Sequence, residues 1–71
     1  MADPAVSLAS VGDAVRDARR GRGWSQTQLG EEAGVSRPTI ARIERSNDVS
    51  VATLAKVVAA VGLTIKIEAA P

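Results

Sequence analysis

The chain has 71 residues, of which 45% are hydrophobic, and a formal net charge of +1. These values predict one small folded domain, with a core limited enough that association with a second chain is expected. The sequence contains neither cysteine nor histidine, which excludes disulfides, thiolate or imidazole metal ligands and histidine-based catalysis. We therefore expect no enzyme activity, no cofactor and no metal site.

The apolar and charged residues also bear on where the chain acts. No apolar run is long enough to span a membrane, and the first residues lack the basic region of a signal peptide, so a cytoplasmic protein is expected.

Most of the nine basic residues are arginines in the first two-thirds of the chain. Such a distribution is typical either of a nucleic-acid-binding face or of ordinary solvated helix surface. The arginines are Arg16, Arg19, Arg20, Arg22, Arg37, Arg42 and Arg45.

A flexible tail, residues 1–6, is predicted to precede the first helix. This helix begins at Ser7 or Ser10 and ends at Gly21 and Gly23, because glycine favours the backbone conformation that terminates helices. Its apolar residues recur with helical spacing and predict one buried face, formed by Val11, Ala14, Val15 and Ala18.

The second predicted helix spans residues 26–33. Ser25 and Gln28 have the spacing of a capping box, in which each side chain satisfies a backbone N–H of the first turn. Gly34 follows at the position where a left-handed residue ends a helix. The residues expected to be buried are Leu29 and Ala33.

A tight turn leads to a third predicted helix over residues 37–45. Ser36 is a suitable N-cap, and Pro38 is tolerated in a first turn because the N–H that it lacks would have no helical partner there. Two short helices joined in this way have the form of a helix-turn-helix. The inward-facing residues of the third helix are expected to be Ile40 and Ile43.

The fourth predicted helix spans residues 51–61, after a polar loop over residues 46–48. Ser50 is its expected N-cap, and Gly62 ends it. Its predicted apolar stripe consists of Val51, Leu54, Ala55, Val58 and Val61.

The segment from Trp24 to Arg45 resembles the Cro/phage-repressor (XRE) helix-turn-helix family. The family pattern corresponds here to Gln26, Leu29-Gly30, Ala33-Gly34-Val35-Ser36, Ile40 and Ile43-Glu44. The one departure is Gly30, where the family usually has alanine, and it should loosen the second helix by about 1 kcal/mol. The resemblance extends from Val11 to Gly62. It implies a mainly α fold, a four-helix lambda-repressor-like DNA-binding domain over residues 7–62.

The resemblance also implies which residues meet DNA, because the N-terminal part of the third helix would face the bases of the major groove. Arg37 and Arg42 are about a turn and a third apart, so they can share a groove-facing side, and arginine matches guanine O6 and N7. Pro38 offers at most an apolar contact, for example with a thymine methyl. The expected base contacts are Arg37, Pro38, Thr39 and Arg42. The expected contacts to the DNA backbone are Gln26, Ser36, Arg45 and Asn47.

Several of these residues also have a purely structural interpretation. Arg37 and Arg42 can be solvated surface, and Gln26 can simply start the second helix. Arg45 can stabilise the C-terminal end of the third helix through the helix dipole.

Other residues near the motif are expected to be structural. Glu44 is expected to pair with an arginine of the first helix, and Trp24 is expected to pack at the edge of the motif. A surface position at the end of the first helix is expected for Arg19, Arg20 and Arg22.

Residues 63–68 alternate between apolar and polar and predict a strand, followed by a short tail over residues 69–71. A lone strand leaves its backbone groups unpaired, so pairing of two copies in a homodimer is expected. The alternative is a disordered or extended tail. The expected dimer-interface residues are Leu63, Ile65 and Ile67.

A two-fold dimer would place two reading helices about 34 Å apart on a palindromic operator. A strand after the fourth helix also resembles the arrangement in HipB-type antitoxins, small DNA-binding dimers that repress their own operon and bind a toxin. The combined expectation is a sequence-specific repressor of double-stranded DNA, with a toxin as a further partner. Two alternatives stay open: a protein-interaction module that neutralises a toxin, with DNA binding secondary, and a phage-type repressor without a toxin.

Overall fold

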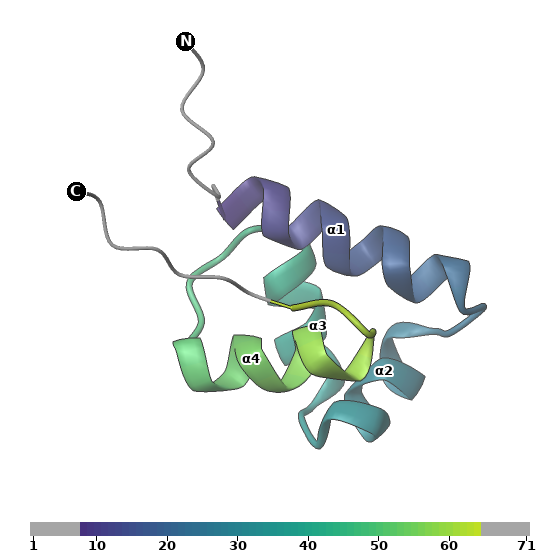
Figure 1. The fold of residues 1–71 in the computed structure, drawn as a ribbon. Helices are drawn as coiled ribbons and strands as arrows, with labels where there is room; N and C mark the ends of the chain where they lie inside the picture. The colour runs from purple at the N-terminus through teal and green to yellow at the C-terminus, as the bar shows by residue number, and fades with distance from the viewer. Residues whose placement is uncertain (1–7, 65–71) are drawn as a thin grey trace, which may run out of the picture.

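Four helices make up the part of the chain that the structure, a computed structural model, describes. This part is residues 8–64, and the surroundings of side chains are described from residue 11 onward. α3 lies in the middle of the fold, where it packs against both α1 and α2, and α4 packs against α2 (Figure 1). The helices are α1 (Leu8–Gly21), α2 (Gln26–Ala33), α3 (Arg37–Glu44) and α4 (Val51–Ala60).

Serine side chains begin three of the four helices. Ser25, Ser36 and Ser50 each have an extended backbone and accept a hydrogen bond from the N–H three residues later. This satisfies a donor that the helix itself leaves free, so all three predicted N-caps are confirmed. Of the two expected starts of the first helix, Ser10 is wrong, because α1 already begins at Leu8, and Ser7 lies outside the described residues.

Left-handed residues end the helices. After α1, α2 and α4 these residues are glycines, with φ of 72° at Gly23, 73° at Gly34 and 79° at Gly62. α3 differs, because the residue after its end with positive φ is Ser46, at 64°. The reversal lets two backbone N–H groups bond back to carbonyls of the last turn, as the Leu63 N–H does to the Val58 oxygen at 2.9 Å.

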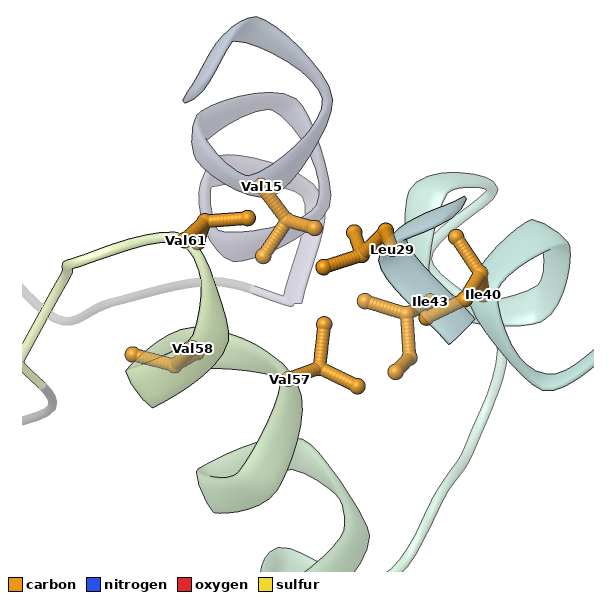
Figure 2. Packing of buried hydrophobic residues seen from close by; sticks show 7 residues of the cluster. All are labelled: Val15, Leu29, Ile40, Ile43, Val57, Val58 and Val61. Atoms are coloured by element: carbon orange, nitrogen blue, oxygen red, sulfur yellow. The ribbon is translucent and has the colours of Figure 1, made fainter. Parts of the chain in front are cut away.

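The core is aliphatic and draws on every helix (Figure 2). Because aromatic residues are almost absent from the sequence, branched aliphatic side chains fill the space between the helices. Half-buried side chains such as Trp24 and Leu54 pack against the edge of this cluster. The buried members are Val15, Leu29, Ile40, Ile43, Val57, Val58 and Val61.

The predicted apolar stripe of α4 is partly wrong. Val51 is 65% exposed and Ala55 is exposed, whereas Val57, which was not predicted, is fully buried. The first turn of α4 lies at the end farthest from α2, so a side chain there has little to pack against (Figure 1). On α1, Ala14 is likewise exposed although burial was expected.

Two glycines allow backbones to approach more closely than a larger residue would permit. A Cβ at Gly12 would lie 2.5 Å from the carbonyl oxygen of Ile43, so glycine brings α1 against the end of α3. A Cβ at Gly30 would lie 2.7 Å from the carbonyl oxygen of Val35, in the turn between α2 and α3. The departure from the family pattern at Gly30 therefore accompanies a closely packed turn.

The predicted strand over residues 63–68 lies mostly outside the described residues, including Ile65 and Ile67. Its two described residues, Leu63 and Thr64, form no strand. Leu63 is 37% exposed, and its N–H completes the end of α4.

Candidate nucleic-acid interface

The residues of α3 that pack in the core determine which of its side chains face solvent. Ile40 and Ile43 are buried in the core, and Gly34 makes the turn that brings α3 back against α2. The side chains of Arg37, Pro38 and Arg42 are exposed. The helix thus presents two arginines and a proline to solvent.

The hydroxyl groups of Ser36 and Thr39 are already paired at the start of α3. The Ser36 Oγ accepts the Thr39 N–H and lies 2.9 Å from the Thr39 Oγ1. Thr39 is half-buried, so less of it is available to a ligand than of its neighbours Arg37 and Pro38. Its expected base contact stays a prediction.

Arg42 is held by the turn that follows α3. Its Nη2 donates a hydrogen bond of 3.0 Å to the carbonyl oxygen of Asp48, at the surface. The Asn47 N–H in turn donates to the Arg42 carbonyl oxygen at 2.9 Å. Arg42 is therefore tied to this turn through both its side chain and its backbone.

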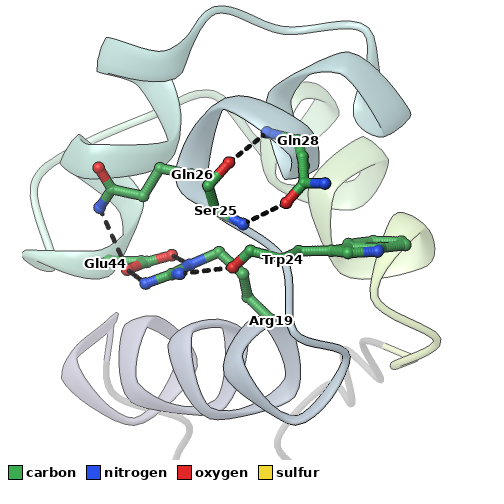
Figure 3. Close-up of polar contacts among 6 residues, drawn as sticks. All are labelled: Arg19, Trp24, Ser25, Gln26, Gln28 and Glu44. Carbon is green, nitrogen blue, oxygen red and sulfur yellow. Dashed lines mark hydrogen bonds and ion pairs between the residues drawn. The ribbon is translucent and has the colours of Figure 1, made fainter.

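At the C-terminal end of α3, Glu44 forms a buried ion pair with Arg19 of α1 (Figure 3). The Arg19 Nε donates to Glu44 Oε2 at 2.7 Å, and its Nη2 donates to Oε1 at 2.9 Å. The Arg19 Nη1 also donates to the Trp24 carbonyl oxygen at 2.9 Å. One guanidinium thus joins α1, α3 and the loop before α2, in the bidentate geometry that arginine and carboxylate favour.

This pair confirms one structural prediction and corrects another. Glu44 does pair with an arginine of the first helix, as expected. The surface position expected for Arg19 is wrong, because Arg19 is buried. The spacing contains a signal for this, since Arg19 follows the buried Val15 by one helical turn and shares its face.

Gln26 extends the same network at the start of α2. Its Nε2 donates to Glu44 Oε1 at 3.3 Å, and the side chain is half-buried. Beside it, the Ser25 N–H donates to Gln28 Oε1 at 2.7 Å, which confirms the predicted capping box (Figure 3). The amide of Gln26 is therefore oriented by Glu44, and its expected phosphate contact stays a prediction.

The ion pair shifts the pKa of both partners. Burial alone raises the pKa of the Glu44 carboxyl, but hydrogen bonds from Arg19 and Gln26, with the charges of Arg19 and Arg16, outweigh burial and lower it below its ordinary value. The pKa of Arg19 is raised, chiefly by its hydrogen bond to Glu44. Both residues are therefore charged at neutral pH.

The remaining predicted contacts lie at the C-terminal end of α3. Arg45 caps the helix and is exposed, and the side chain of Asn47 in the following turn is exposed as well. With Arg37 and Arg42, Arg45 makes a set of three exposed arginines on one helix and its cap, whereas the exposed Glu31-Glu32 pair belongs to α2.

Trp24 sits at the corner between α1 and α2, half-buried and packed against the core as expected. The Arg22 guanidinium lies over its ring, 5.1 Å from the ring centre, in a cation–π arrangement.

Within the described part of the chain, no helix has the length and apolar character to cross a membrane.

Comparison with known proteins identifies the family of the chain. A family model described as helix-turn-helix matches residues 15–67, which is well over half of the chain. No curated protein matches the chain. The matched region contains α2, the turn at Gly34 and α3 with its exposed arginines. The chain belongs to the XRE-type helix-turn-helix family of DNA-binding transcription regulators.

Proposed function

We propose that this protein is a sequence-specific transcriptional repressor that binds a palindromic operator as a homodimer. The observation that carries the proposal is that α3 is anchored in the core while two of its arginines stay exposed. Ile40 and Ile43 are buried and Glu44 is bound to Arg19, whereas Arg37 and Arg42 are exposed. A rigid helix that presents arginines suits entry into the major groove.

Each of the expected contact residues takes a role that its chemistry permits. Arg37 and Arg42 read guanine through their paired N–H donors, and Pro38 and the Thr39 methyl contact apolar base edges such as a thymine methyl. These contacts carry the sequence preference. The contacts that position the protein on the phosphate backbone come from Gln26, Ser36, Arg45 and Asn47.

The dimer follows from the size of the chain and from its C-terminal pattern. The described part of the chain has a core of seven buried aliphatic residues, which is small for a lone chain. Residues 63–68 alternate in the way that a paired strand requires, and we propose that two copies pair through Leu63, Ile65 and Ile67. Two-fold symmetry then matches a palindromic site.

The test is binding to operators selected from random duplex DNA with the full chain. Arg37→Ala and Arg42→Ala should each weaken binding to the preferred site by about 1–3 kcal/mol, because each removes a bidentate base contact. The matched control is Arg20→Ala, which removes an exposed arginine of α1. If both α3 variants bind like the control, the assignment of base readers is wrong.

Salt dependence checks the backbone contacts in the same assay. Each phosphate contact lowers the slope of log affinity against log salt by about 0.9. Arg45→Ala should therefore flatten the slope by about one contact per protomer while it leaves the base preference unchanged. An unchanged slope would remove Arg45 from the set of backbone contacts.

A second candidate role is that of an antitoxin, which the alternating segment after α4 favours. In this role the dimer represses its own operon and also binds a toxin. The test is purification of the full chain together with the product of its neighbouring gene. A stoichiometric complex that suppresses that product's toxicity supports the role, and repression without any such complex supports a phage-type repressor.

A further inference from the structure

We infer that the turn after α3, residues 45–48, positions the guanidinium of Arg42 for base reading. The inference rests on the proposed function, in which Arg42 contacts a base. It adds a contribution from the Asp48 carbonyl group, which orients Arg42 before DNA arrives. Asp48 is therefore a positioning residue, and it acts through its backbone.

The geometry is reciprocal. The Arg42 Nη2 donates to the Asp48 carbonyl oxygen at 3.0 Å, and the Asn47 N–H donates to the Arg42 carbonyl oxygen at 2.9 Å. The turn is thereby attached to both ends of the residue that it orients. The backbone bond fixes where the Asp48 carbonyl lies relative to α3, and the side-chain bond then fixes the guanidinium relative to that carbonyl.

The turn itself has a defined shape. Ser46 has a φ of 64°, and the described part of the chain contains no other positive φ outside glycine. The Ser46 N–H donates to the Ile43 carbonyl oxygen at 3.0 Å, which closes the end of α3. A Cβ at Gly12 would lie 3.1 Å from the Ser46 Oγ, so the small residue on α1 leaves room for this serine. The turn is thus packed against α1 rather than projecting freely.

The bond to Asp48 leaves Arg42 able to read a base. A guanidinium carries five N–H donors, and bidentate contact with guanine needs two of them. One donor on Asp48 therefore leaves enough for DNA. An arginine side chain that is already oriented loses less conformational freedom on binding, so its base contact becomes more selective.

The test weakens one carbonyl group in the full chain. Replacing the amide between Asp48 and Val49 by an ester makes the Asp48 carbonyl a weaker acceptor and leaves every side chain in place. The lost Val49 N–H donates to no residue that the structure describes. The matched control is an ester between Val49 and Ser50, which alters the neighbouring carbonyl. Asp48→Asn removes the carboxylate charge and keeps the backbone carbonyl, so it distinguishes the effect of the charge from that of the carbonyl.

The measured quantity is discrimination at the base pair where Arg42→Ala abolishes preference, taken as the ratio of affinities for the matched and substituted operators. The Asp48 ester should lower this ratio about three- to ten-fold, the range of one hydrogen bond. Affinity for random duplex and the midpoint of thermal unfolding should stay unchanged. The control ester and Asp48→Asn should keep the ratio within about two-fold.

The outcomes separate the inference from the function on which it rests. If Arg42→Ala leaves every base preference intact, the base-reading role is wrong and the inference falls with it. If Arg42→Ala abolishes a preference but the Asp48 ester keeps the ratio, only the inference is overturned. A higher ratio in the ester also overturns it, because the bond would then compete with DNA.

Discussion

At the scale of single residues, the side chain of Glu44 links α3 to both α1 and α2. It accepts two hydrogen bonds from Arg19 and one from Gln26, and its side chain is only 5% exposed. Charges removed from water to this degree depend on one another, since either one alone would face its full desolvation penalty. The network therefore determines how α1, α2 and α3 meet.

Removal of the carboxylate should be strongly destabilising. Glu44→Ala leaves the Arg19 guanidinium buried without its partner and should lower the free energy of unfolding by about 3–5 kcal/mol. Urea unfolding at one protein concentration measures this. The comparison is Asp13→Ala, which breaks the exposed pair with Arg16 and should change the stability by less than about 1 kcal/mol. Equal effects of the two variants would contradict a special role for the buried pair.

The same carboxylate predicts a dependence on acid. Its folded pKa lies below the ordinary glutamate value of about 4.3, so its contribution is complete above that pH and disappears as the pH falls through the folded pKa. The stability gap between the natural chain and Glu44→Gln should therefore be largest near neutral pH and should shrink below about pH 4. Unfolding curves at several pH values check this, and a constant gap would contradict it.

The sequence predicts some of these residues better than others. Serine caps and helix-ending glycines act through local backbone groups, so Ser25, Ser36 and Gly34 could be assigned from their neighbours alone. The partner of Glu44 depends on how two distant helices cross. The sequence therefore indicates that Glu44 has a partner on the first helix, but several arginines there have suitable chemistry.

At the scale of elements, the turn between α2 and α3 packs so closely against α2 that it needs glycine, a residue of low helix propensity. Gly30 weakens α2 as an isolated helix, yet it allows the Val35 carbonyl to approach it. This approach occurs in the turn that brings α3 back against α2. Tertiary packing thus takes precedence over intrinsic propensity at this position.

The close packing at Gly30 predicts a change in stability opposite in sign to the change expected from helix propensity. Gly30→Ala should destabilise the protein, because the new methyl would meet the Val35 carbonyl oxygen at 2.7 Å and the turn must shift. The control is Gly21→Ala in α1, where a Cβ would meet nothing within 4 Å and the helix should gain up to about 1 kcal/mol. Thermal unfolding of both variants checks this, and a stabilised Gly30→Ala would show that the turn relaxes freely.

The helices differ in how well the sequence predicts their limits and their buried faces. The limits of α2 agree with the prediction, because a cap and a left-handed glycine mark its two ends. The buried face of α4 was predicted less well, because this helix is apolar nearly all round and periodicity alone cannot say which valines face inward. Packing against α2 decides that Val57 is buried and Val51 is exposed.

At the scale of the whole molecule, the proposed dimer predicts what removal of the C-terminal segment should do. The end of α4 determines where that truncation should begin. Because the Leu63 N–H caps α4, a truncation should keep Leu63 and Thr64 and remove residues 65–71. This chain should be a monomer, or a much weaker dimer, by light scattering, since it loses most of the proposed strand. Removal of residues 69–71 alone should leave the dimer intact. A tight dimer in the longer truncation would place the interface elsewhere.

The corner at Trp24 has a practical consequence for all of these measurements. The chain contains one tryptophan and no tyrosine or phenylalanine, so its near-ultraviolet absorption and intrinsic fluorescence arise from a single indole. The Trp24 side chain packs against the core and lies under the Arg22 guanidinium, and the backbone carbonyl of the same residue accepts a hydrogen bond from Arg19. A change in the emission of Trp24 therefore reports on one defined place, the corner between α1 and the helix-turn-helix of α2 and α3. The measurement needs no attached label.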